Sequence, residues 1–465
     1  MRRKPVAKTI DRVRGSGSGG WLDDRFHVSN RGSTVSTEVR AGITTFLAMA
    51  YIIFVNPSIL SNAIDFEGAF PQLLTVTCVA AAVGTLIMGL WANLPFALAP
   101  GMGLNAYFTF TVVLGSGYEW ETALGAVFVS GILFLVISVT GLRTWILDAI
   151  PLYLKHAVTA GIGAFLAIIG FQGSGLIGDS PATLVTRGDW TSPTLWLAAG
   201  GLLITAALLA LRLKGSLVIG IAAITVVAIL TGAEVYVGAE GLVSFPGFND
   251  GIFGFTWPGD LIGQLDIAGA LGTGILSVVF TFLFVDFFDT AGTLIGLSDK
   301  AGMLTEDGKM TAPRAAFTAD GAATAVGALL GTSSTTSYIE SAAGIEDGAK
   351  TGLASVVTAL LFVGAIFLSP LASVIPEVAT APVLILLGAM MMTGAAKVDW
   401  NDYRMSIPAF LTIVGMPFTY SITDGISLGI ISHTVIMATT GKHREVHPVM
   451  YVLSVLLVWR FFVVG

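Results

Sequence analysis

The chain has 465 residues, of which 54% are hydrophobic and 11% charged, and its mean hydropathy is +0.83. Soluble globular domains carry about twice that share of charged residues, so the composition excludes a protein that faces water on all sides and indicates a polytopic membrane protein. The net charge of −7 lacks the basic excess of a nucleic-acid-binding surface. We therefore expect the lipid bilayer, and no nucleic acid, as a partner.

Residues 1–36 are predicted to form a basic cytoplasmic tail. The first forty residues carry nine of the 23 Lys and Arg residues and include a Gly/Ser-rich run at 14–20. They contain no apolar stretch that would serve as a signal-peptide core. We therefore expect a multi-pass protein of the cell membrane with its N-terminus in the cytoplasm.

Fourteen apolar stretches follow, each near the roughly 20 residues that cross a bilayer. A further segment, 447–463, is either a fifteenth span or a helix lying at the inner surface. The fourteen spans are expected near 40–62, 72–94, 96–115, 121–142, 155–178, 192–212, 215–232, 269–297, 313–330, 333–346, 351–375, 379–396, 404–420 and 422–440.

The distribution of charge supports this count. Lys and Arg residues between spans fall in alternate loops, on the side of the basic N-terminus, as the positive-inside rule expects. Asp and Glu residues gather in the opposite loops, where Arg187 is the one basic residue. The long outward segment 233–268 separates the first seven spans from the second seven and is interpreted as a linker.

Two halves of seven spans must insert in opposite orientations, which is the inverted-repeat architecture of secondary transporters. In Ile150–Ala164 an Ile-Pro pair is followed ten residues later by an aliphatic-Gly-Ala triplet, and this pattern recurs in Ile375–Ala389. The third and tenth spans are short and broken, and they occupy corresponding places in the two halves. Broken spans at equivalent positions indicate the binding site, because their free backbone groups must line protein or water.

Three of the carboxylates within the predicted spans stand out. Asp286 and Asp289 stand one helical turn apart in an otherwise apolar helix, and Glu340 follows in a Ser/Thr-rich stretch. An acid in mid-helix costs roughly 2.5–3.5 kcal/mol even on lenient insertion scales, so such residues usually face a cavity and mark an ion, proton or substrate path.

Several motifs around these acids are similar to those of a known family. The segments Glu38–Ile52, Ala99–Tyr107 and Phe287–Thr293 look like the azaguanine-sensitive branch of the nucleobase–cation symporter family, the adenine/guanine/hypoxanthine permeases. The ninth-and-tenth-span signature of that family resembles Ala319-Asp320-Gly321, Gly331-Thr332, Thr335-Thr336, Tyr338-x-Glu340-Ser341 and Gly344.

The resemblance implies an all-α protein with two inverted seven-span repeats, a core domain that moves against a gate domain, and homodimers. It implies import of the purine nucleobases adenine, hypoxanthine and guanine by proton symport, with Na⁺ as the alternative coupling ion. The expected divisions are a core domain at 37–152 and 269–375, a gate domain at 153–232 and 376–441, an extracytoplasmic linker at 233–268, and a C-terminal segment at 442–465.

The family's eighth-span substrate acid corresponds to Asp289, and Glu340 is expected to face it across the site. A carboxylate suits this ligand because nucleobases present adjacent N–H donors, and charge-assisted hydrogen bonds are strong and directional. Two carboxylates in one low-dielectric cavity repel each other, which favours proton uptake. Glu340 is the favoured proton carrier, and Asp289 and Asp286 are the alternatives in a mutually titrating group.

Further site residues are implied by position. Phe96 and Tyr338 match residues that flank the base, where aromatic rings stack, although ordinary core packing also explains each. Ser341 and Thr336 are expected to complete the substrate's hydrogen bonds. Asn105 ends the broken third span as a substrate-binding amide or, alternatively, as a helix cap or packing residue.

Two groups of residues are expected to brace the core domain. Asp320 matches the family's Ala-Asp-Gly motif and is interpreted as a structural acid. Asp286 is interpreted either as part of the proton path or as a partner for Thr44 and Thr45 of the first span.

Other functions remain as alternatives. A xanthine/uracil-type permease or an anion exchanger would share the fold, but Asp289 and Glu340 would repel an anion. A membrane-embedded acid hydrolase is the remote alternative, because Asp286 and Asp289 lie on one helix rather than on two. We expect a transporter rather than an enzyme, with no cofactor. No metal site is expected, since the five histidines lack metal-ligand spacing.

Overall fold

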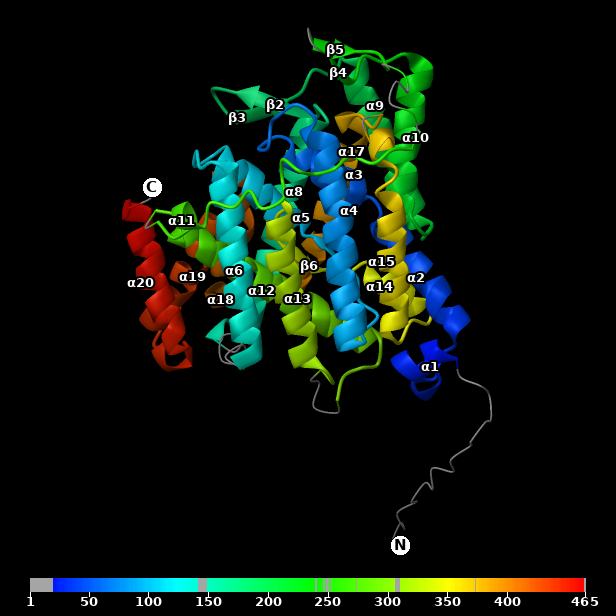
Figure 1. Cartoon of the computed structure of the whole chain (residues 1–465). Helices are drawn as coiled ribbons and strands as arrows, with labels where there is room; N and C mark the ends of the chain where they lie inside the picture. The colour runs from blue at the N-terminus through cyan, green and yellow to red at the C-terminus, as the bar shows by residue number, and fades with distance from the viewer. Residues whose placement is uncertain are drawn as a thin grey trace, which may run out of the picture.

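The computed structural model describes residues 20–140, 149–238, 241–245, 247, 251, 253–272, 274–305, 310–372 and 374–463. Predictions for 1–19 of the tail, 141–142 of the fourth span, parts of the linker and 464–465 lie outside these residues. Figure 1 shows helices running between two ends, one carrying α1 and the other carrying strands β2–β5. We call these the α1 end and the strand end.

The first half of the chain contains most of the predicted spans as helices. Its elements are α1 (Trp21–Phe26), η1 (Ser29–Arg31), α2 (Val35–Met49), α3 (Ile52–Leu60), α4 (Ala69–Ile87), η2 (Met88–Ala92), β1 (Leu98–Pro100), α5 (Met102–Ala106), η3 (Tyr107–Val113), α6 (Trp120–Thr140), α8 (Leu152–Gly173), β2 (Ile177–Ser180), β3 (Leu184–Arg187), α9 (Pro193–Ala210), α10 (Ser216–Thr231), β4 (Tyr236–Gly238) and β5 (Gly241–Val243).

The second half repeats this pattern of long helices around one broken segment. Its elements are α11 (Ile267–Ala270), α12 (Leu276–Lys300), α13 (Pro313–Leu330), β6 (Thr335–Ser337), α14 (Ser341–Glu346), α15 (Gly352–Ala365), α16 (Ser369–Ala372), α17 (Glu377–Met391), η4 (Met392–Lys397), α18 (Tyr403–Thr419), α19 (Ile422–Thr439), η5 (His443–Glu445) and α20 (Pro448–Val463).

Eight helices of the described chain are long and apolar enough to cross a membrane, and shorter apolar helices accompany them at Met102–Val113, Ser216–Thr231, Gly352–Ala365 and Pro448–Phe462. Two predicted spans differ markedly in their bounds from the helices. The eighth begins at Leu276 rather than at 269, because Asp266 caps the separate helix α11 and glycines, which are poor helix formers, follow it. The eleventh ends at Ala365 rather than at 375. The chain turns directly after Ala365, before Pro370.

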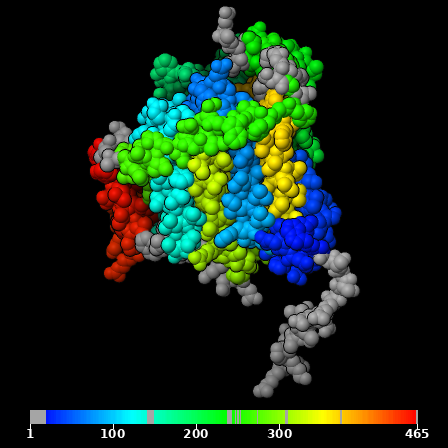
Figure 2. All heavy atoms as spheres, in the orientation of Figure 1, coloured from blue at the N-terminus to red at the C-terminus, as the bar shows by residue number. Residues whose placement is uncertain are grey.

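The helices pack as two groups. The first bundle contains α2–α6 and α12–α15, and the second contains α8–α10 and α17–α19. The described linker residues 253–272 cross the outside of the first bundle as a strap, the green band of Figure 2. The strap is tied to α4 by Gln72 Nε2, which donates to Asp260 Oδ2 at 2.7 Å, and to α13 by Gly263 N, which donates to Leu329 O at 2.8 Å.

The segment predicted either to span or to lie flat, 447–463, forms helix α20 alongside α19 (Figure 1). Ser454 Oγ donates to Thr434 Oγ1 at 2.8 Å, and Arg460 pairs with Asp424 at 2.7 Å. The later residue of α20 meets the earlier residue of α19, so the two helices are antiparallel neighbours. A helix lying flat across the end of α19 would not make both contacts.

Close approach between α14 and α2 depends on Gly344. A Cβ atom added at Gly344 would lie 2.1 Å from Thr45 Oγ1 and 2.6 Å from Ala41 O. Thr45 is thereby placed as a packing residue against the helix that follows Glu340. The contact fixes the distance between the first and tenth spans.

We predict that Gly344→Ala lowers the thermal stability of the purified protein in detergent. Overpacking of this kind costs about 1–3 kcal/mol, and both neighbouring atoms belong to a packed helix. The matched control is Gly364→Ala in α15, where an added Cβ meets nothing within 4 Å. Equal melting temperatures for the two variants would contradict the close-packing explanation.

Candidate functional site

Two broken spans meet in the interior of the first bundle. Strands β1 and β6 pair antiparallel, with Leu98 opposite Ser337 and Pro100 opposite Thr335. Every residue of both strands is buried. An unpaired backbone group in an apolar interior costs several kcal/mol, so mutual pairing is what allows two extended segments to lie there.

Side chains extend this pairing beyond the strands. Ser341 Oγ accepts from Ala97 N at 2.9 Å, and Thr85 Oγ1 accepts from Leu98 N at 2.9 Å. Tyr338 N donates to Ala97 O at 2.9 Å. The predicted ligand Ser341 therefore ties the tenth span to the third.

Asp320 of α13 holds the eighth and tenth spans together. Its Oδ1 accepts from Ser337 N at 2.8 Å and from Ser337 Oγ at 2.6 Å, while Oδ2 accepts from Thr290 Oγ1 at 2.6 Å. Thr336 Oγ1 lies 2.8 Å from Thr290 Oγ1 in the same network. Both Asp320 and Thr336 are buried, so these contacts are bracing contacts.

Asp286 is also buried, and Thr324 Oγ1 of α13 donates to its Oδ2 at 2.9 Å. Its other oxygen, Oδ1, has no hydrogen-bond partner among the described residues. No hydrogen bond joins Asp286 to the predicted alternative partners, Thr44 and Thr45, in the described part of the chain. Thr44 bonds instead to Asp347 at the α1 end, because the face of α12 that carries Asp286 is turned to α13.

A third buried network surrounds Asn105. Its amide donates to Asn56 Oδ1 of α3 and its carbonyl oxygen accepts from Ser333 Oγ. Asn56 in turn donates to Thr77 Oγ1 at 2.7 Å and to Thr332 Oγ1 at 3.1 Å. These bonds connect the first, second, third and tenth spans, and Asn105 is fully buried in this structure.

Asp289 and Glu340 differ from the two buried acids because both keep part of their surface exposed. The Asp289 side chain makes no hydrogen bond or ion pair with any residue that the structure describes, and the charges of Asp320 and Glu340 lie within electrostatic range of it. Glu340 Oε1 accepts from Tyr51 Oη at 2.6 Å. Two acids with free hydrogen-bonding capacity thus lie beside the crossing strands.

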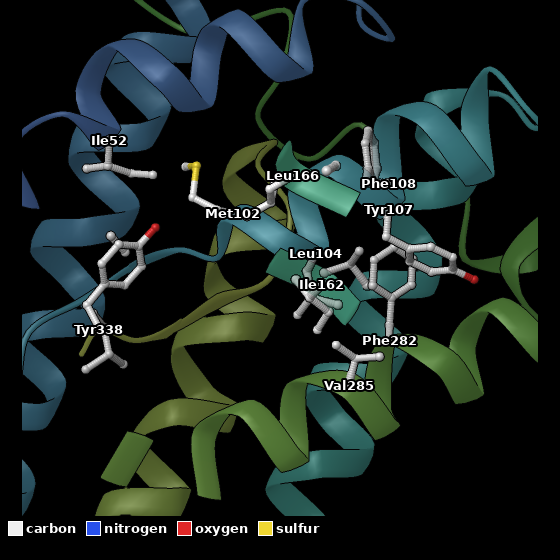
Figure 3. Close-up of a cluster of buried hydrophobic side chains, with 14 of the residues drawn as sticks. Ile52, Met102, Leu104, Tyr107, Phe108, Ile162, Leu166, Phe282, Val285 and Tyr338 are labelled. Carbon is white, nitrogen blue, oxygen red and sulfur yellow. The ribbon is translucent and has the colours of Figure 1, made fainter. Parts of the chain in front are cut away.

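The two predicted aromatic residues are placed differently. Phe96 is fully buried just before β1, where its carbonyl accepts from Ser355 Oγ at 3.1 Å. Tyr338 lies directly before Ile339 and Glu340, and its hydroxyl donates to Pro100 O at 2.5 Å. Figure 3 shows its ring directed toward Ile52 and Met102.

A cavity of about 420 Å³ leads to Glu340 from the α1 end, between the two bundles. Of the four intramembrane acids Asp286, Asp289, Asp320 and Glu340, only Glu340 lines this cavity. The first bundle contributes the segment around Glu340 and the second contributes the loop that joins α9 to α10. The charged residues on its walls are Arg212, Lys214, Lys300, Glu346 and Asp347.

One ion pair joins the two bundles across this cavity. Lys214 of the α9–α10 loop pairs with Asp347 Oδ2, which also accepts from Thr44 Oγ1. Partial burial disfavours the charged form of Asp347, but the hydrogen bonds from Lys214 and Thr44 outweigh it, so the pKa of Asp347 lies below its usual value. Asp347 is therefore ionised at neutral pH.

Toward the strand end the bundles are in direct contact. Thr111 Oγ1 donates to Tyr420 O at 2.9 Å, and Thr423 Oγ1 donates to Tyr107 Oη at 2.8 Å. A Cβ added at Gly103 would lie 2.4 Å from Ile162 Cγ2. In Figure 3, Ile162 of α8 lies against Leu104, with Phe282 and Val285 of α12 beside them. Access to Glu340 is therefore from the α1 end.

Sequence reasoning did not single out Tyr51, Asn56 or Lys214. A tyrosine in an apolar stretch looks like core packing, and an asparagine before Pro57 looks like a cap or turn residue. The partner of Lys214 lies 133 residues away. The one available signal was the presence of polar atoms in the first span, which require partners when buried.

A bundle of apolar helices with two broken spans crossing inside it, and with carboxylates beside a cavity, is the architecture of a membrane transporter. Residues 36–428 match the model of the Permease family, Xan_ur_permease, and the chain belongs to this nucleobase–cation symporter family, as its motifs predicted.

Individual relatives agree with that assignment. The chain is 42% identical to the guanine/hypoxanthine permease PbuO of Bacillus subtilis, covering 94% of this chain and 100% of that one. It is 40% identical to the adenine permease AdeP of Escherichia coli, covering 95% and 96%.

The transmembrane domain of the cyanobacterial bicarbonate transporter BicA matches with a TM-score of 0.60 at 14% identity, covering 85% of this chain and 97% of that one. At this identity the likeness concerns the fold alone. It confirms the predicted all-α fold of two inverted seven-span repeats.

We predict that Asp320→Asn lowers thermal stability in detergent much more than Asp289→Asn. The first variant leaves buried donors of Ser337 and Thr290 competing for one fewer acceptor, and an unsatisfied buried group costs about 1–3 kcal/mol. The second removes a charge that has no bonded partner in the described chain. A loss of stability that is equal in both variants would show that Asp289 is also a bracing residue.

Proposed function

We propose that this protein imports purine nucleobases by proton symport. The observation that carries the proposal is the division among the four acids: Asp286 and Asp320 are buried and bonded to neighbouring side chains, whereas Asp289 and Glu340 are partly exposed beside the crossing strands. The names of the relatives support adenine, hypoxanthine and guanine as substrates.

Asp289 and Glu340 fit the recognition of a purine. A purine edge presents ring and exocyclic N–H groups, and each carboxylate can accept such donors in charge-assisted hydrogen bonds. Tyr338, next to Glu340 along the chain, offers an aromatic face for stacking, which contributes about 1–3 kcal/mol per base. Phe96 would contact the base only after its surroundings shift, because its side chain is fully buried here.

Proton coupling follows from the same two acids. Asp289 and Glu340 lie within electrostatic range of each other. Ionising both in an apolar interior costs free energy, because the like charges repel and both lose solvation. One proton taken up from outside would relieve this repulsion and accompany the substrate. Glu340 is the favoured carrier because it lines the cavity, and Asp286, with its unpartnered oxygen, is the alternative.

Alternating access would come from movement of the first bundle, as the core, against the second bundle, as the gate. Contacts at the strand end are direct, while the cavity reaches Glu340 from the α1 end. With the N-terminus in the cytoplasm, this arrangement corresponds to an inward-facing state. Family resemblance further supports a homodimer as the functional unit.

We predict that proteoliposomes containing the protein accumulate labelled hypoxanthine or adenine under an imposed inward proton gradient. Glu340→Gln and Asp289→Asn should each weaken uptake about 10–100-fold, because each removes a charge-assisted hydrogen bond worth about 1.5–3 kcal/mol. Asp299→Asn on the same helix as Asp289 is the matched control, since its side chain is exposed.

Parallel gradients and substrates separate the alternatives. If Na⁺ alone drives accumulation, then Na⁺ rather than the proton is the coupling ion. If xanthine or uracil is taken up and adenine and hypoxanthine are not, the protein is a xanthine/uracil-type permease. Absence of uptake for every nucleobase under every gradient would overturn the proposed function and leave the fold unchanged.

We predict that Lys214→Met shifts the protein away from the state in which the cavity is open. An exposed ion pair contributes about 0–1 kcal/mol, so the population should change by up to about fivefold. Ile339, which lines the cavity, can be replaced by cysteine as a reporter, because the one natural cysteine, Cys78, is buried. Labelling of Ile339→Cys by a polar thiol reagent should slow.

The matched control for this experiment is Lys300→Met. Lys300 also lines the cavity, but its ion pair with Glu346, at 2.7 Å, joins two helices of the same bundle. Its loss should leave the labelling rate unchanged. A similar change in both variants would mean that the cavity's charge, rather than the contact between bundles, governs labelling.

A further inference from the structure

Tyr51 occupies a break in the first span. Helix α2 ends at Met49 and α3 begins at Ile52, and the intervening turn directs Tyr51 toward the tenth span. The side chain is 1% exposed, and its hydroxyl donates to Glu340 Oε1 at 2.6 Å. A buried phenol with its only polar atom on a carboxylate is bonded to a specific partner, which packing alone does not require.

The bond restricts Glu340. A glutamate has three rotatable side-chain bonds, and this one lies at the N-terminal boundary of α14 with part of its surface in the cavity. Tyr51 fixes one carboxylate oxygen. Oε2 then remains as the oxygen to which no other residue of the described chain donates, so a ligand meets a carboxylate of defined orientation.

The bond also distinguishes the two charge states of Glu340. A hydroxyl that donates to a carboxylate stabilises the ionised form more than the neutral acid. The titratable groups nearest to Glu340 besides Tyr51 are Asp289 of α12 and Tyr338. The cavity adds the charges of Arg212, Lys214, Lys300, Glu346 and Asp347.

We propose that Tyr51 is a positioning residue for Glu340, and that its hydroxyl sets both the orientation of the carboxylate toward the substrate and the pH range over which Glu340 releases its proton. This inference rests on the proposed function for its meaning in transport. The hydrogen bond itself can be tested without any substrate.

The first experiment compares Tyr51→Phe with the wild type in proton-driven uptake of hypoxanthine across a series of pH values. Without the hydroxyl, KM should rise about tenfold, because Glu340 loses its fixed orientation. The alkaline limb of the uptake profile should move to higher pH by about half to one unit, since the ionised form loses a donor. An unchanged pH profile would overturn the proposal, even if KM rises.

Tyr107→Phe is the matched control. Tyr107 is equally buried, and its hydroxyl is bonded to Thr423, which does not titrate in this range. Its loss removes a buried hydroxyl of the same kind from the interface between the bundles. The maximal rate is free to change in this variant, but the pH profile of uptake should not.

The second experiment measures thermal stability of the purified proteins against pH. The difference between wild type and Tyr51→Phe should be small at low pH, where Glu340 is protonated, and should grow as pH rises through its ionisation. For Tyr107→Phe the difference should be constant. A constant difference for Tyr51→Phe would overturn the proposal.

The two experiments fail separately. If the wild type takes up no purine, the proposed function is wrong, and the stability measurement still decides whether Tyr51 acts on the charge of Glu340. If uptake is proton-driven and both measurements with Tyr51→Phe match those with Tyr107→Phe, the proposed function stands and Tyr51 is a packing residue.

Discussion

The pairing of β1 with β6 is the interaction on which the rest of the site depends. Two chain segments that leave helical geometry inside an apolar bundle would expose backbone donors and acceptors, at several kcal/mol for each. Antiparallel pairing satisfies them mutually, and Ser341, Thr85 and Tyr338 bond the groups at their ends. The third and tenth spans therefore form one unit, although the strands are more than 200 residues apart in sequence. Residues that border them, including Glu340, inherit a fixed position.

Around this unit the intramembrane acids divide by environment. Asp320 accepts from Ser337 and Thr290 and so connects three spans, whereas Asp289 has exposed surface and no bonded partner in the described chain. A buried carboxylate that is fully hydrogen-bonded stabilises one packing arrangement, and one that is left without partners remains available to a ligand or a proton. The same residue type thus occupies two environments, bonded to its neighbours in α13 and without a side-chain partner in the described chain in α12.

Composition and periodicity were sufficient for the helices, because hydropathy and loop charge are local signals; the predicted ninth span coincides with α13 at Pro313–Leu330. They were insufficient for the strands. Both strands have only three residues, and β1 contains Pro100, which resembles a loop because proline is disfavoured within sheets. The partner of each strand comes from the other half of the chain. Acids at 286, 289 and 340 were visible because charge in an apolar span is conspicuous. Tyr51 was not, because its role depends on the distant Glu340, and the same holds for the Lys214–Asp347 pair.

The likeness to a bicarbonate transporter shows how far the fold alone determines the ligand. The backbone arrangement is shared at a TM-score of 0.60, yet the proposed site with Asp289 and Glu340 would oppose an anion by simple electrostatics. The fold therefore supplies two bundles and two broken spans that cross inside one of them, and under the proposed function the side chains at the crossing set the charge and shape of the substrate. In this chain Glu340, the proposed substrate ligand, is held by neighbours whose contacts the motifs do not reveal: Asp320 accepts from Ser337 in the strand before it, Gly344 brings α14 onto α2, and Tyr51 donates to the carboxylate itself. Under the proposed function, substrate selectivity in this chain would therefore depend also on residues that touch no substrate.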